Sequence, residues 1–532
     1  MDKYKPYAFL FLAAVLYTLG FPNLFKVYLP FAPILATTIL IYYLFKSVST
    51  KERIIFYLFY NSIINILSFY WITNTLHEFG NIPVYIAMIG NALFAFIFNP
   101  QYFVLIFILY WTDRLPKLKE SYFKWGLFNV LLAALLTTLE YFLPQQFPVM
   151  LGQPWIIISE YLGAARYLGL PIFSFMSYLL ALEIIRAIRL KRFSYINLFS
   201  ILIFIIINPF LMPLYQQTQH KELNTRLVQA NISNFLKVDS ESGAYHSVEQ
   251  VLERYYQLST APYPEGKKLD IIIWPETAYP YPITKNKLEI KDSSLPKMIE
   301  EIVHKQKSYL LFGGYEHIQS STLLDHFESD YNASLLVNRD GKLAEIYHKH
   351  VLIPFGETLP LGPLTKFASQ YIPEMAFFAV GTKWPLFRLD NGIHFISSIC
   401  YEILRPEFMR EYLNTIASKP DLMINITNDS WYGDTVEPEQ HLFLTRWRAL
   451  EFGLPILRST NSGISSYIDA LGRETTRLGY NKSGNLDLSI KLAKNSFHST
   501  PTFFQTFGFW GIIPLWLLYF IFHTILIKLK YD

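Results

Sequence analysis

The sequence is poor in cysteine, in net charge and, over long stretches, in charged residues of either sign. Cys400 is the single cysteine among 532 residues, so an internal disulfide is excluded. The formal net charge is only +4, which gives no reason to expect a nucleic-acid partner. Charged residues make up 17% of the chain and hydrophobic residues 52%, a composition too apolar for an ordinary soluble enzyme.

Apolar residues are concentrated towards the two ends of the chain. A membrane-spanning helix needs about 20 mostly apolar residues, and eight segments meet this requirement: 6–24, 27–46, 54–76, 82–111, 125–144, 167–188, 194–215 and 505–527. The residues between the seventh and eighth segments have the composition of a soluble protein. The sequence therefore predicts a membrane domain over 1–215, a catalytic domain over 216–502, and a last span with its tail over 503–532.

Lysine and arginine alternate between the loops in a way that predicts the orientation of these spans. With the N-terminus in the cytoplasm, fifteen of them fall on the cytoplasmic side and only Lys26 and Arg166 in the short outer loops. Cytoplasmic loops carry such an excess in membrane proteins. We therefore expect both termini in the cytoplasm and the inserted domain on the outer face. The fifteen are Lys3, Lys5, Lys46, Lys51, Arg53, Arg114, Lys117, Lys119, Lys124, Arg186, Arg189, Lys191, Arg192, Lys528 and Lys530.

Within the insert the hydrophobic pattern changes from long runs to short strands separated by amphipathic helices. We predict strands at 226–230, 269–273, 310–313, 334–337, 342–347, 394–399, 422–426, 456–459 and 464–468, and helices at 245–259, 294–306 and 439–452. Short apolar strands between helices are typical of an α/β domain with a buried sheet.

Three of these strands end next to a residue capable of chemistry. They deliver Glu276, Lys349 and Cys400 to strand ends, where the reactive groups of α/β sheets gather. A thiol needs a base or a nearby cation to act as a nucleophile, and a cation also stabilises an oxyanion. The three residues together therefore supply the base, the cation and the nucleophile that acyl transfer requires. Spacing alone leaves open that Cys400 is simply a small buried hydrophobic residue.

The residues around these three positions are more specific than the positions themselves. Three stretches resemble, in order, the glutamate, lysine and cysteine motifs of the nitrilase superfamily: Trp274–Pro275–Glu276–Thr277, His348–Lys349–His350 with Pro354–Phe355–Gly356–Glu357, and Ile399–Cys400–Tyr401–Glu402. Further stretches are similar to one membrane-embedded branch, the apolipoprotein N-acyltransferases: Asn428–Gly433, Gln440–His441 with Arg446, Arg448, Ala449 and Glu451, and Arg458–Gly463.

This resemblance implies a fold and a reaction. The fold is an eight-span membrane domain with a nitrilase-like αββα sandwich inserted between spans seven and eight. The reaction moves an acyl chain from a phospholipid, for which we expect phosphatidylethanolamine, through a thioester on the cysteine. The acceptor is the α-amino group of the diacylglyceryl-cysteine at the N-terminus of apolipoproteins. The resemblance further implies no cofactor, a monomer among membrane lipids, and a bacterial inner membrane with the catalytic domain on the periplasmic side.

The resemblance also assigns roles to individual residues. Glu276 is expected to act as general base and acid, and Lys349 to stabilise the oxyanion. Glu357 is expected to orient or tune the lysine and the cysteine. Tyr401 is expected to offer its backbone N–H to the oxyanion, and Glu402 to support the site.

Four further residues are candidates for a substrate or lipid site. Asn428 and Trp431 follow a strand end, although Asn428 and its neighbour also fit an ordinary turn. Glu140 stands near the outer end of the fifth span, either as an interfacial residue or as the wall of a lipid-entry cavity. Trp155 lies in an outer loop and suits the membrane interface. The branch has a tryptophan where this chain has Val238, which affects the details of lipid and acceptor recognition.

Two other readings stay open. One is a membrane-bound amidohydrolase of the nitrilase superfamily, although a soluble substrate does not require eight spans. The other is a transport or structural protein with an inactive insert, against which the intact motifs speak. His348 and His350 flank the lysine, but no partner cluster accompanies them in the sequence, so we expect no metal. Residues 358–381 are expected to form a lid over the cleft.

Overall fold

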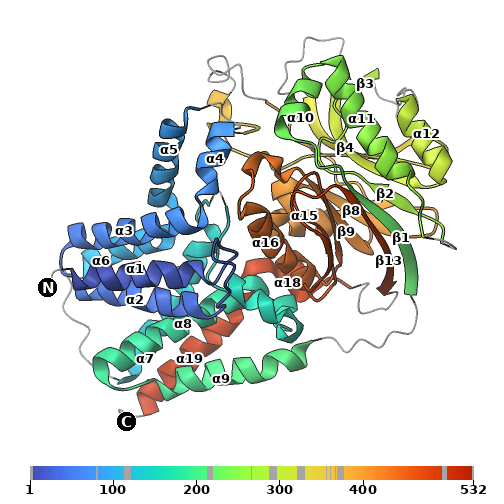
Figure 1. Ribbon diagram of the computed structural model, residues 1–532. Helices are drawn as coiled ribbons and strands as arrows, with labels where there is room; N and C mark the ends of the chain where they lie inside the picture. Colours follow the sequence, from blue (N-terminus) through green and yellow to red (C-terminus); the bar gives the residue numbers. More distant parts are fainter. Residues whose placement is uncertain are drawn as a thin grey trace. The chain divides into compact units, whose positions relative to one another are not determined.

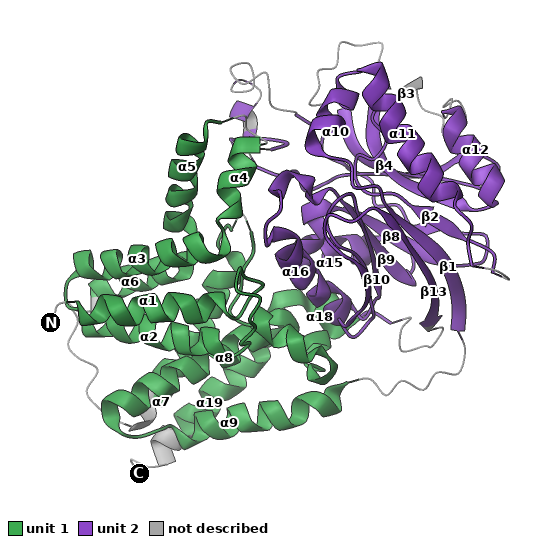
Figure 2. Cartoon of the chain, in the orientation of Figure 1, with its two compact units in different colours: residues 1–214, 502–532 green, residues 215–501 purple. Residues whose placement is uncertain are grey.

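The computed structural model describes residues 4–78, 82–112, 122–145, 147–212, 220–264, 267–286, 296–319, 330–354, 356–359, 361–365, 367, 377–493 and 500–529. Residues 360, 366 and 368–376 of the expected lid lie outside these ranges. The chain divides into two compact units, residues 1–214 with 502–532 and residues 215–501 (Figures 1 and 2). We describe each unit by itself.

Unit 1 is helical. Its elements are α1 Lys5–Thr18, α2 Ala32–Lys46, α3 Thr50–Ser68, α4 Trp71–Glu78, α5 Val84–Ile97, α6 Pro100–Thr112, α7 Tyr122–Phe142, η1 Gln153–Tyr161, α8 Ala165–Leu190, α9 Tyr195–Ile207, η2 Asn208–Leu211, α18 Phe503–Phe507, η7 Gly508–Ile512 and α19 Ile513–Leu529. Among the described residues, two helical stretches, Ala165–Leu190 and Phe503–Ile525, are long and apolar enough to cross a bilayer. Counting two bent helix pairs as one span each raises this number to four, and the remaining apolar helices are shorter.

Two of the predicted spans are bent rather than straight. The segment predicted at 54–76 consists of α3 and α4, which meet at 68°, and the segment predicted at 82–111 consists of α5 and α6, which meet at 52°. The second bend has a local cause. Asn99 adopts a left-handed backbone with φ of 52°, a conformation that interrupts a right-handed helix, and Pro100 then begins α6.

Buried polar side chains connect the helices of unit 1. Glu183 on α8 accepts hydrogen bonds from the side-chain amides of Asn129 on α7 (2.8 Å) and Asn197 on α9 (2.6 Å). It also accepts the backbone N–H of Ser194 at 2.9 Å. A carboxylate inside an apolar bundle is costly unless such donors surround it, so these contacts fix how the three helices pack.

Unit 2 contains two mixed β-sheets. The first has the order β13-β1-β2-β4-β5-β6, with β3 paired to β4, and the second has the order β12-β11-β10-β9-β8-β7. The strands are β1 His220–Gln229, β2 Ile271–Ile273, β3 Pro282–Asn286, β4 Tyr309–Gln319, β5 Asp330–Val337, β6 Leu343–His348, β7 Phe387–Arg388, β8 His394–Ile399, β9 Leu422–Thr427, β10 Ile456–Thr460, β11 Ser465–Ile468, β12 Glu474–Leu478 and β13 Gly484–Ala493. The α/β class predicted from the strand pattern is confirmed.

The two sheets pack face to face, with helices on their outer sides. Direct hydrogen bonds join the sheets, from Ser334 on β5 to Ser397 on β8 (2.8 Å) and from Thr460 on β10 to Gln229 on β1 (3.1 Å). Helices α11 and α12 bury their apolar sides against the first sheet in one continuous core. Helices α15 and α16 connect the parallel strands β8, β9 and β10, and such crossovers place both helices on one face of a sheet. The helices of unit 2 are α10 Asn234–Glu241, α11 Tyr245–Thr260, α12 Lys297–Gln306, η4 Gly362–Leu364, η5 Cys400–Leu404, α15 Pro406–Thr415, η6 Asp429–Tyr432 and α16 Glu437–Phe452.

Strand direction brings the predicted reactive residues to one edge. Strands β2 and β4 are parallel, and β6 runs the same way because β4, β5 and β6 are successively antiparallel. Strands β8 and β9 are also parallel to each other. The carboxyl ends of β2 and β6 therefore lie at the same edge of the first sheet.

Candidate active site

The turn after β2 places Glu276 at this edge. Trp274 is fully buried, and its indole N–H donates to the Ser259 hydroxyl at 2.8 Å. This hydrogen bond fixes the start of the turn against α11. Thr277 has a left-handed backbone with φ of 48°. A Cβ atom on Gly313 of the neighbouring β4 would lie 2.5 Å from the Cα atom of Glu276, so the turn needs a glycine opposite it.

Lys349 follows β6 and lies between two carboxylates. Its Nζ is 3.0 Å from Glu276 Oε1 and 2.8 Å from Glu357 Oε1, and its side chain is fully buried. Glu357 Oε2 also accepts the backbone N–H of Ile353 at 2.9 Å, which folds the segment after Lys349 back over it. The predicted proximity of Glu276, Lys349 and Glu357 is thus present in the structure.

Asn332 completes this arrangement, and the sequence analysis missed it. Its side-chain amide donates to Glu276 Oε1 at 2.9 Å and to Glu357 Oε1 at 3.1 Å. Its backbone carbonyl accepts the N–H of Lys349 at 2.9 Å. Asn332 therefore contacts both glutamate side chains and the backbone of Lys349. We call Glu276, Asn332, Lys349 and Glu357 the lysine cluster.

Cys400 lies at a sharp turn between β8 and η5. Its backbone is left-handed, with φ of 54°, a strained conformation for a residue other than glycine and one that concentrates at functional sites. Asn425 on β9 donates to the Cys400 carbonyl at 3.3 Å and to the Ser398 hydroxyl at 3.2 Å. The turn is therefore held by side chains of the adjacent strand.

Glu402 ties the cysteine turn to the lysine segment. One of its oxygens accepts the backbone N–H of Ile399 and the Tyr347 hydroxyl, each at 2.8 Å. The other accepts the backbone N–H groups of His350 at 2.6 Å and Val351 at 3.0 Å. Burial raises the pKa of Glu402 to about 7, against the effect of these donors. Glu402 thus connects the cysteine motif to the lysine motif through hydrogen bonds to both.

The electrostatics separate the roles of the thiol and the amine. Burial raises the pKa of the Cys400 thiol, and the Glu276 carboxylate raises it further, while Lys349 acts in the opposite direction. Burial alone would lower the pKa of Lys349, but Glu276 and Glu357 hold that pKa well above its usual value. The resting site therefore contains a neutral thiol and a permanent cation. Such a thiol requires a base at the moment of attack, and such a lysine suits oxyanion stabilisation rather than proton abstraction.

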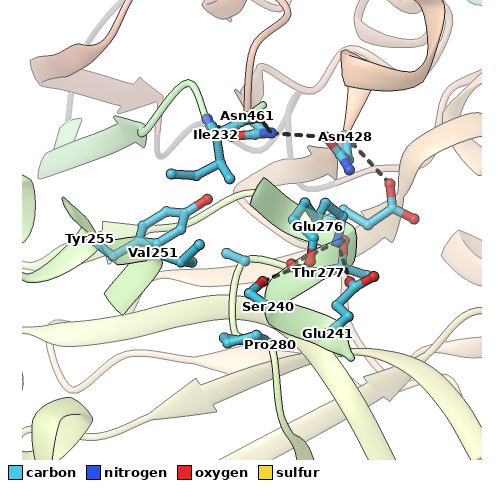
Figure 3. A pocket seen from close by; sticks show the side chains of 12 residues that line it. Ile232, Ser240, Glu241, Val251, Tyr255, Glu276, Thr277, Pro280, Asn428 and Asn461 are labelled. Atoms are coloured by element: carbon cyan, nitrogen blue, oxygen red, sulfur yellow. Dashed lines mark hydrogen bonds and ion pairs between the residues drawn. The ribbon is translucent and has the colours of Figure 1, made fainter. Parts of the chain in front are cut away.

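The end of β9 also reaches the glutamate. The backbone N–H of Asn428 donates to Glu276 Oε2 at 3.0 Å, and the Asn461 side chain donates to Asn428 Oδ1 at 3.2 Å. Both asparagines line a small pocket beside Glu276, together with Lys237 and Thr277 (Figure 3). The side-chain nitrogen of Asn428 is buried and has no hydrogen-bond partner among the described residues. It offers a donor to a polar group entering this pocket.

Asp429 follows Asn428 and is held by Arg458. The guanidinium donates to Asp429 Oδ2 at 2.9 Å and to Asn425 Oδ1 at 2.7 Å, so Arg458 holds a buried carboxylate and also positions the amide behind the cysteine turn. The Thr427 hydroxyl donates to Asp429 Oδ1 at 3.0 Å. Burial would raise the pKa of Asp429, but Arg458 lowers it to about 2.

The other predicted residues are placed differently. Tyr401 is buried, with the Arg405 guanidinium carbon 4.7 Å from its ring centroid, and Trp431 is half-buried in η6. Glu140 and Trp155 belong to unit 1. Glu140 accepts the Leu151 N–H at 2.8 Å and the Tyr178 hydroxyl at 2.9 Å, and Trp155 donates to Ser177 at 3.0 Å. Both are buried within unit 1, and an interfacial position for Trp155 and a role for either residue at a lipid site stay predictions.

The two histidines beside Lys349 have separate surroundings. His348 pairs with the buried Glu316. His350 stacks on Trp384 with ring centroids 4.1 Å apart, and burial lowers its pKa to about 4. The two residues contact each other through the backbone, since His350 Nδ1 is 2.8 Å from the His348 carbonyl oxygen.

Comparison with known families accounts for both units. Residues 224–494 match the family Carbon-nitrogen hydrolase, and residues 13–183 match the family Apolipoprotein N-acyltransferase N-terminal domain. The first match covers just over half of the chain and contains the lysine cluster and Cys400. The chain therefore belongs to the carbon-nitrogen hydrolase family.

Relatives of similar length point to one branch of that family. An apolipoprotein N-acyltransferase of Bdellovibrio bacteriovorus is 29% identical over 507 residues, 92% of this chain and 90% of the relative. One from Haemophilus ducreyi is 27% identical, over 84% of this chain and 82% of the relative. The resemblance inferred from the motifs is thus confirmed. Among solved structures, Saccharomyces cerevisiae Nit3, of the nitrilase superfamily, is 18% identical and covers 54% of this chain and 95% of its own, with a TM-score of 0.35.

Proposed function

We propose that this chain is a membrane-bound acyltransferase that transfers an acyl chain from a phospholipid to the N-terminal amine of apolipoproteins through a thioester on Cys400. The observation that carries the proposal is the convergence of Glu276, Lys349 and Glu357 at the edge of the sheet, with electrostatic coupling of the first two to Cys400. The relatives that match nearly the whole chain are named apolipoprotein N-acyltransferases.

In the first half-reaction the Cys400 sulfur attacks the ester carbonyl carbon of the phospholipid while its proton passes to Glu276. The carbonyl oxygen takes the negative charge, and the Lys349 ammonium stabilises it. The C–O bond then breaks, Glu276 returns the proton to the leaving alkoxide, and a lysophospholipid departs. The raised pKa of the thiol supports this order, because a neutral thiol gains its nucleophilicity only as the proton leaves.

In the second half-reaction the neutral α-amino group of a diacylglyceryl-cysteine attacks the thioester carbon. Glu276 accepts the proton from the amine, Lys349 again stabilises the oxyanion, and the C–S bond breaks. The proton on Glu276 then returns to the thiolate. An amide has formed and the enzyme is regenerated without any cofactor. The hydrogen bond from the Asn428 N–H to Glu276 Oε2 keeps the carboxylate oriented through both steps.

The proposal extends to the membrane arrangement. Each of the eight predicted apolar segments overlaps at least one helix of unit 1, which supports eight spans, with both termini in the cytoplasm of a bacterial cell. Unit 2 then acts on the periplasmic face of the inner membrane. Phosphatidylethanolamine as donor and a monomeric enzyme complete the proposal. Both substrates carry acyl chains that stay in the bilayer, so an enzyme fixed in the membrane meets them in two dimensions.

The first experiment measures the intact mass of detergent-purified protein after incubation with phosphatidylethanolamine. We expect a gain of one acyl chain that neutral hydroxylamine removes, and no gain in Cys400→Ser. Because Cys400 is the single cysteine, a hydroxylamine-sensitive adduct has only one residue to occupy.

The second experiment supplies a synthetic diacylglyceryl-cysteine peptide to the acylated enzyme. N-acylated peptide is the expected product. Release of free fatty acid in its place, at an unchanged rate without the peptide, would replace the acyltransferase by a hydrolase. Failure of several phospholipids to acylate folded protein would contradict the first half-reaction.

A further inference from the structure

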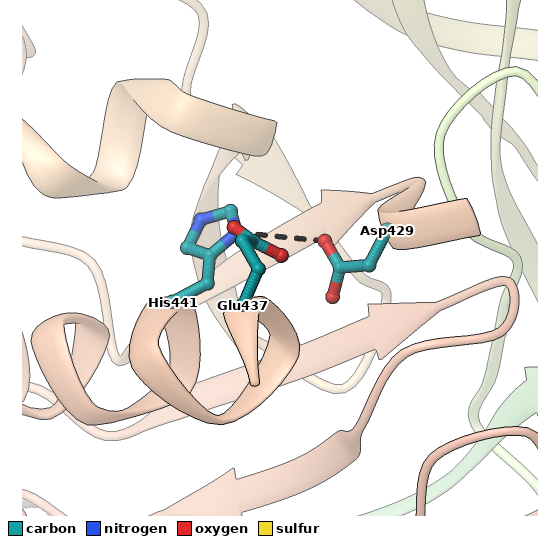
Figure 4. Close-up of side chains that lie close together, drawn as sticks. All are labelled: Asp429, Glu437 and His441. Carbon is teal, nitrogen blue, oxygen red and sulfur yellow. Dashed lines mark ion pairs between the residues drawn. The ribbon is translucent and has the colours of Figure 1, made fainter. Parts of the chain in front are cut away.

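We propose that Asp429, Glu437 and His441 form a binding site for one divalent transition-metal ion such as Zn²⁺, buried in unit 2 and separate from the lysine cluster. We call these three residues the histidine cluster (Figure 4). Asp429 lies in η6, and the other two lie one turn apart on the first turns of α16. The inference concerns ion binding and does not depend on the proposed acyl transfer.

The first observation is convergence. The three side chains each direct one ligand atom to a common point, with all three atoms within 4.8 Å of one another. His441 Nδ1 is 3.4 Å from Asp429 Oδ1 and 3.6 Å from Glu437 Oε1. Two ligands bound to a tetrahedral zinc ion by bonds of about 2.1 Å lie about 3.4 Å apart. The two distances from His441 Nδ1 thus match those of ligands around one ion, and the third pair of atoms lies within 4.8 Å.

The second observation is independent of the first. Both carboxylate oxygens of Glu437 and both ring nitrogens of His441 are buried and make no hydrogen bond of normal geometry among the described residues, and His441 Nδ1 has only the two longer contacts given above. The relative exposure of Glu437 is 0% and that of His441 is 1%. A buried polar atom without a partner costs about 1–3 kcal/mol and more when charged. At 3.6 Å the two groups are too far apart for a good hydrogen bond, and a shared ion bonds to Glu437 and to His441 Nδ1 at once.

The charges are consistent with a cation. Asp429 and Glu437 carry two negative charges when ionised, and Arg458 supplies one positive charge through Asp429 Oδ2. One negative charge then remains in a site that excludes water. Asp429 Oδ1 faces the cluster while Oδ2 is held by Arg458, the arrangement that orients a ligating carboxylate in metal sites.

A proton competes with the metal at this site. Burial raises the pKa of Glu437, and Asp429 raises it further, while Arg458 opposes both. Burial also lowers the pKa of His441, which keeps its nitrogens free to ligate.

The test uses the full chain carrying a tag without histidines, expressed in medium with Co²⁺ and purified in detergent. We expect one equivalent of cobalt by mass spectrometry after dialysis, with visible absorption bands of a nitrogen- and oxygen-ligated ion. Glu437→Gln keeps the shape of the side chain and removes the charge, and it should weaken Co²⁺ binding on the order of 100-fold or more. His304→Gln, at an exposed histidine of α12, is the matched control and should keep the full equivalent.

Three results would overturn the proposal. The first is wild-type protein that retains no cobalt or zinc after expression in either metal. The second is equal metal content in wild type and Glu437→Gln. The third is a thermal midpoint that Glu437→Gln raises equally with Zn²⁺ and with EDTA, because the cluster would then hold only a proton. The wild-type measurement decides the question even if the variant fails to fold.

Discussion

Two buried ionisable clusters in unit 2 differ in how completely they are partnered. In the lysine cluster, Lys349 makes ion pairs with both carboxylates and Asn332 donates to both. In the histidine cluster, four side-chain atoms of Glu437 and His441 make no hydrogen bond of normal geometry among the residues described. Burial of ionisable groups therefore does not by itself define a reaction centre. The paired charges of the lysine cluster hold its side chains in place for the reaction. The unpaired side-chain atoms of the histidine cluster are available to bind an ion.

The largest effect is expected from breaking the pairing of the lysine cluster. Lys349→Met leaves two buried carboxylates without their cation, and removal of one partner of a buried ion pair costs about 3–5 kcal/mol. We expect a thermal midpoint lowered by several degrees and no acyl adduct on Cys400, measured by differential scanning fluorimetry and intact mass.

A compensating variant sharpens this prediction. Adding Glu276→Gln and Glu357→Gln to Lys349→Met removes the uncompensated charges, so stability should return in part while the adduct stays absent. A triple variant no more stable than Lys349→Met would show that the loss comes from packing of the lysine stem rather than from charge.

The second prediction concerns the backbone beside Glu276. In Gly313→Ala the new Cβ would lie 2.5 Å from both the Glu276 Cα and the Pro275 carbonyl oxygen, so the turn after β2 must move. Forced overpacking costs about 1–3 kcal/mol, and displacement of the base should slow acylation by on the order of 100-fold. The rate of adduct formation and the thermal midpoint measure the two effects.

The adjacent glycine is a matched control on the same strand. A Cβ on Gly314 meets only ordinary contacts of 3.6–3.7 Å. Gly314→Ala should therefore acylate at nearly the wild-type rate. Equal losses in the two variants would mean that β4 itself, rather than the turn carrying Glu276, is sensitive to substitution.

The third prediction tests Asn332 as a positioning residue. Asn332→Ala removes donors to two carboxylates, with an expected loss of about 1–3 kcal/mol of stability and a lower acylation rate constant. Asn332→Asp places a third carboxylate against Glu276 and Glu357, so it should be worse than alanine at neutral pH and recover towards alanine as the pH falls. Asp and Ala variants with the same pH profile would contradict the electrostatic role.

Asn332 also shows where sequence reasoning ends. Glu276, Lys349 and Cys400 were found because each follows a strand read forwards along the chain, next to a recognisable motif. Asn332 lies at the beginning of β5, and β5 is antiparallel to both β4 and β6, so its first residues share the edge with their last. Asp340 and Gly341 indicate a hairpin between β5 and β6, but nothing in the sequence shows that the first residues of β5 lie beside Glu276 and Glu357. Nine strands and the helices α11, α12 and α16 were predictable because they depend on local patterns, whereas the strands β3, β7, β12 and β13 and the helices α10 and α15 were not predicted.

The histidine cluster was missed for a related reason. The spacing of Glu437 and His441 on α16 is visible in the sequence, since residues four apart share a helix face. Their third member is supplied by η6, and only the fold brings it opposite them. The bends between α3 and α4 and between α5 and α6 were missed because hydropathy measures apolar content and not direction. Local patterns therefore predict elements, whereas contacts between elements require the structure.

The smallest effect is expected at the histidine cluster without metal. The pKa of Glu437 is raised in the fold, so the stability that its protonated form contributes is complete below the pKa of the unfolded chain and is lost as the pH rises through the folded value. In EDTA, wild type should lose stability relative to Glu437→Gln as the pH rises above the ordinary pKa of a glutamate. Asp429 acts in the opposite direction, because its pKa is lowered to about 2, and it affects stability only in more acidic solutions.

Thermal midpoints of wild type and Glu437→Gln, recorded over a series of pH values, measure the difference in stability. It should grow with pH in EDTA and reverse when Zn²⁺ is added, because the ion restores to wild type a partner that glutamine cannot replace. A difference independent of pH would show that Glu437 does not titrate in the folded protein. Protonation of Glu437 would then not explain the difference in stability.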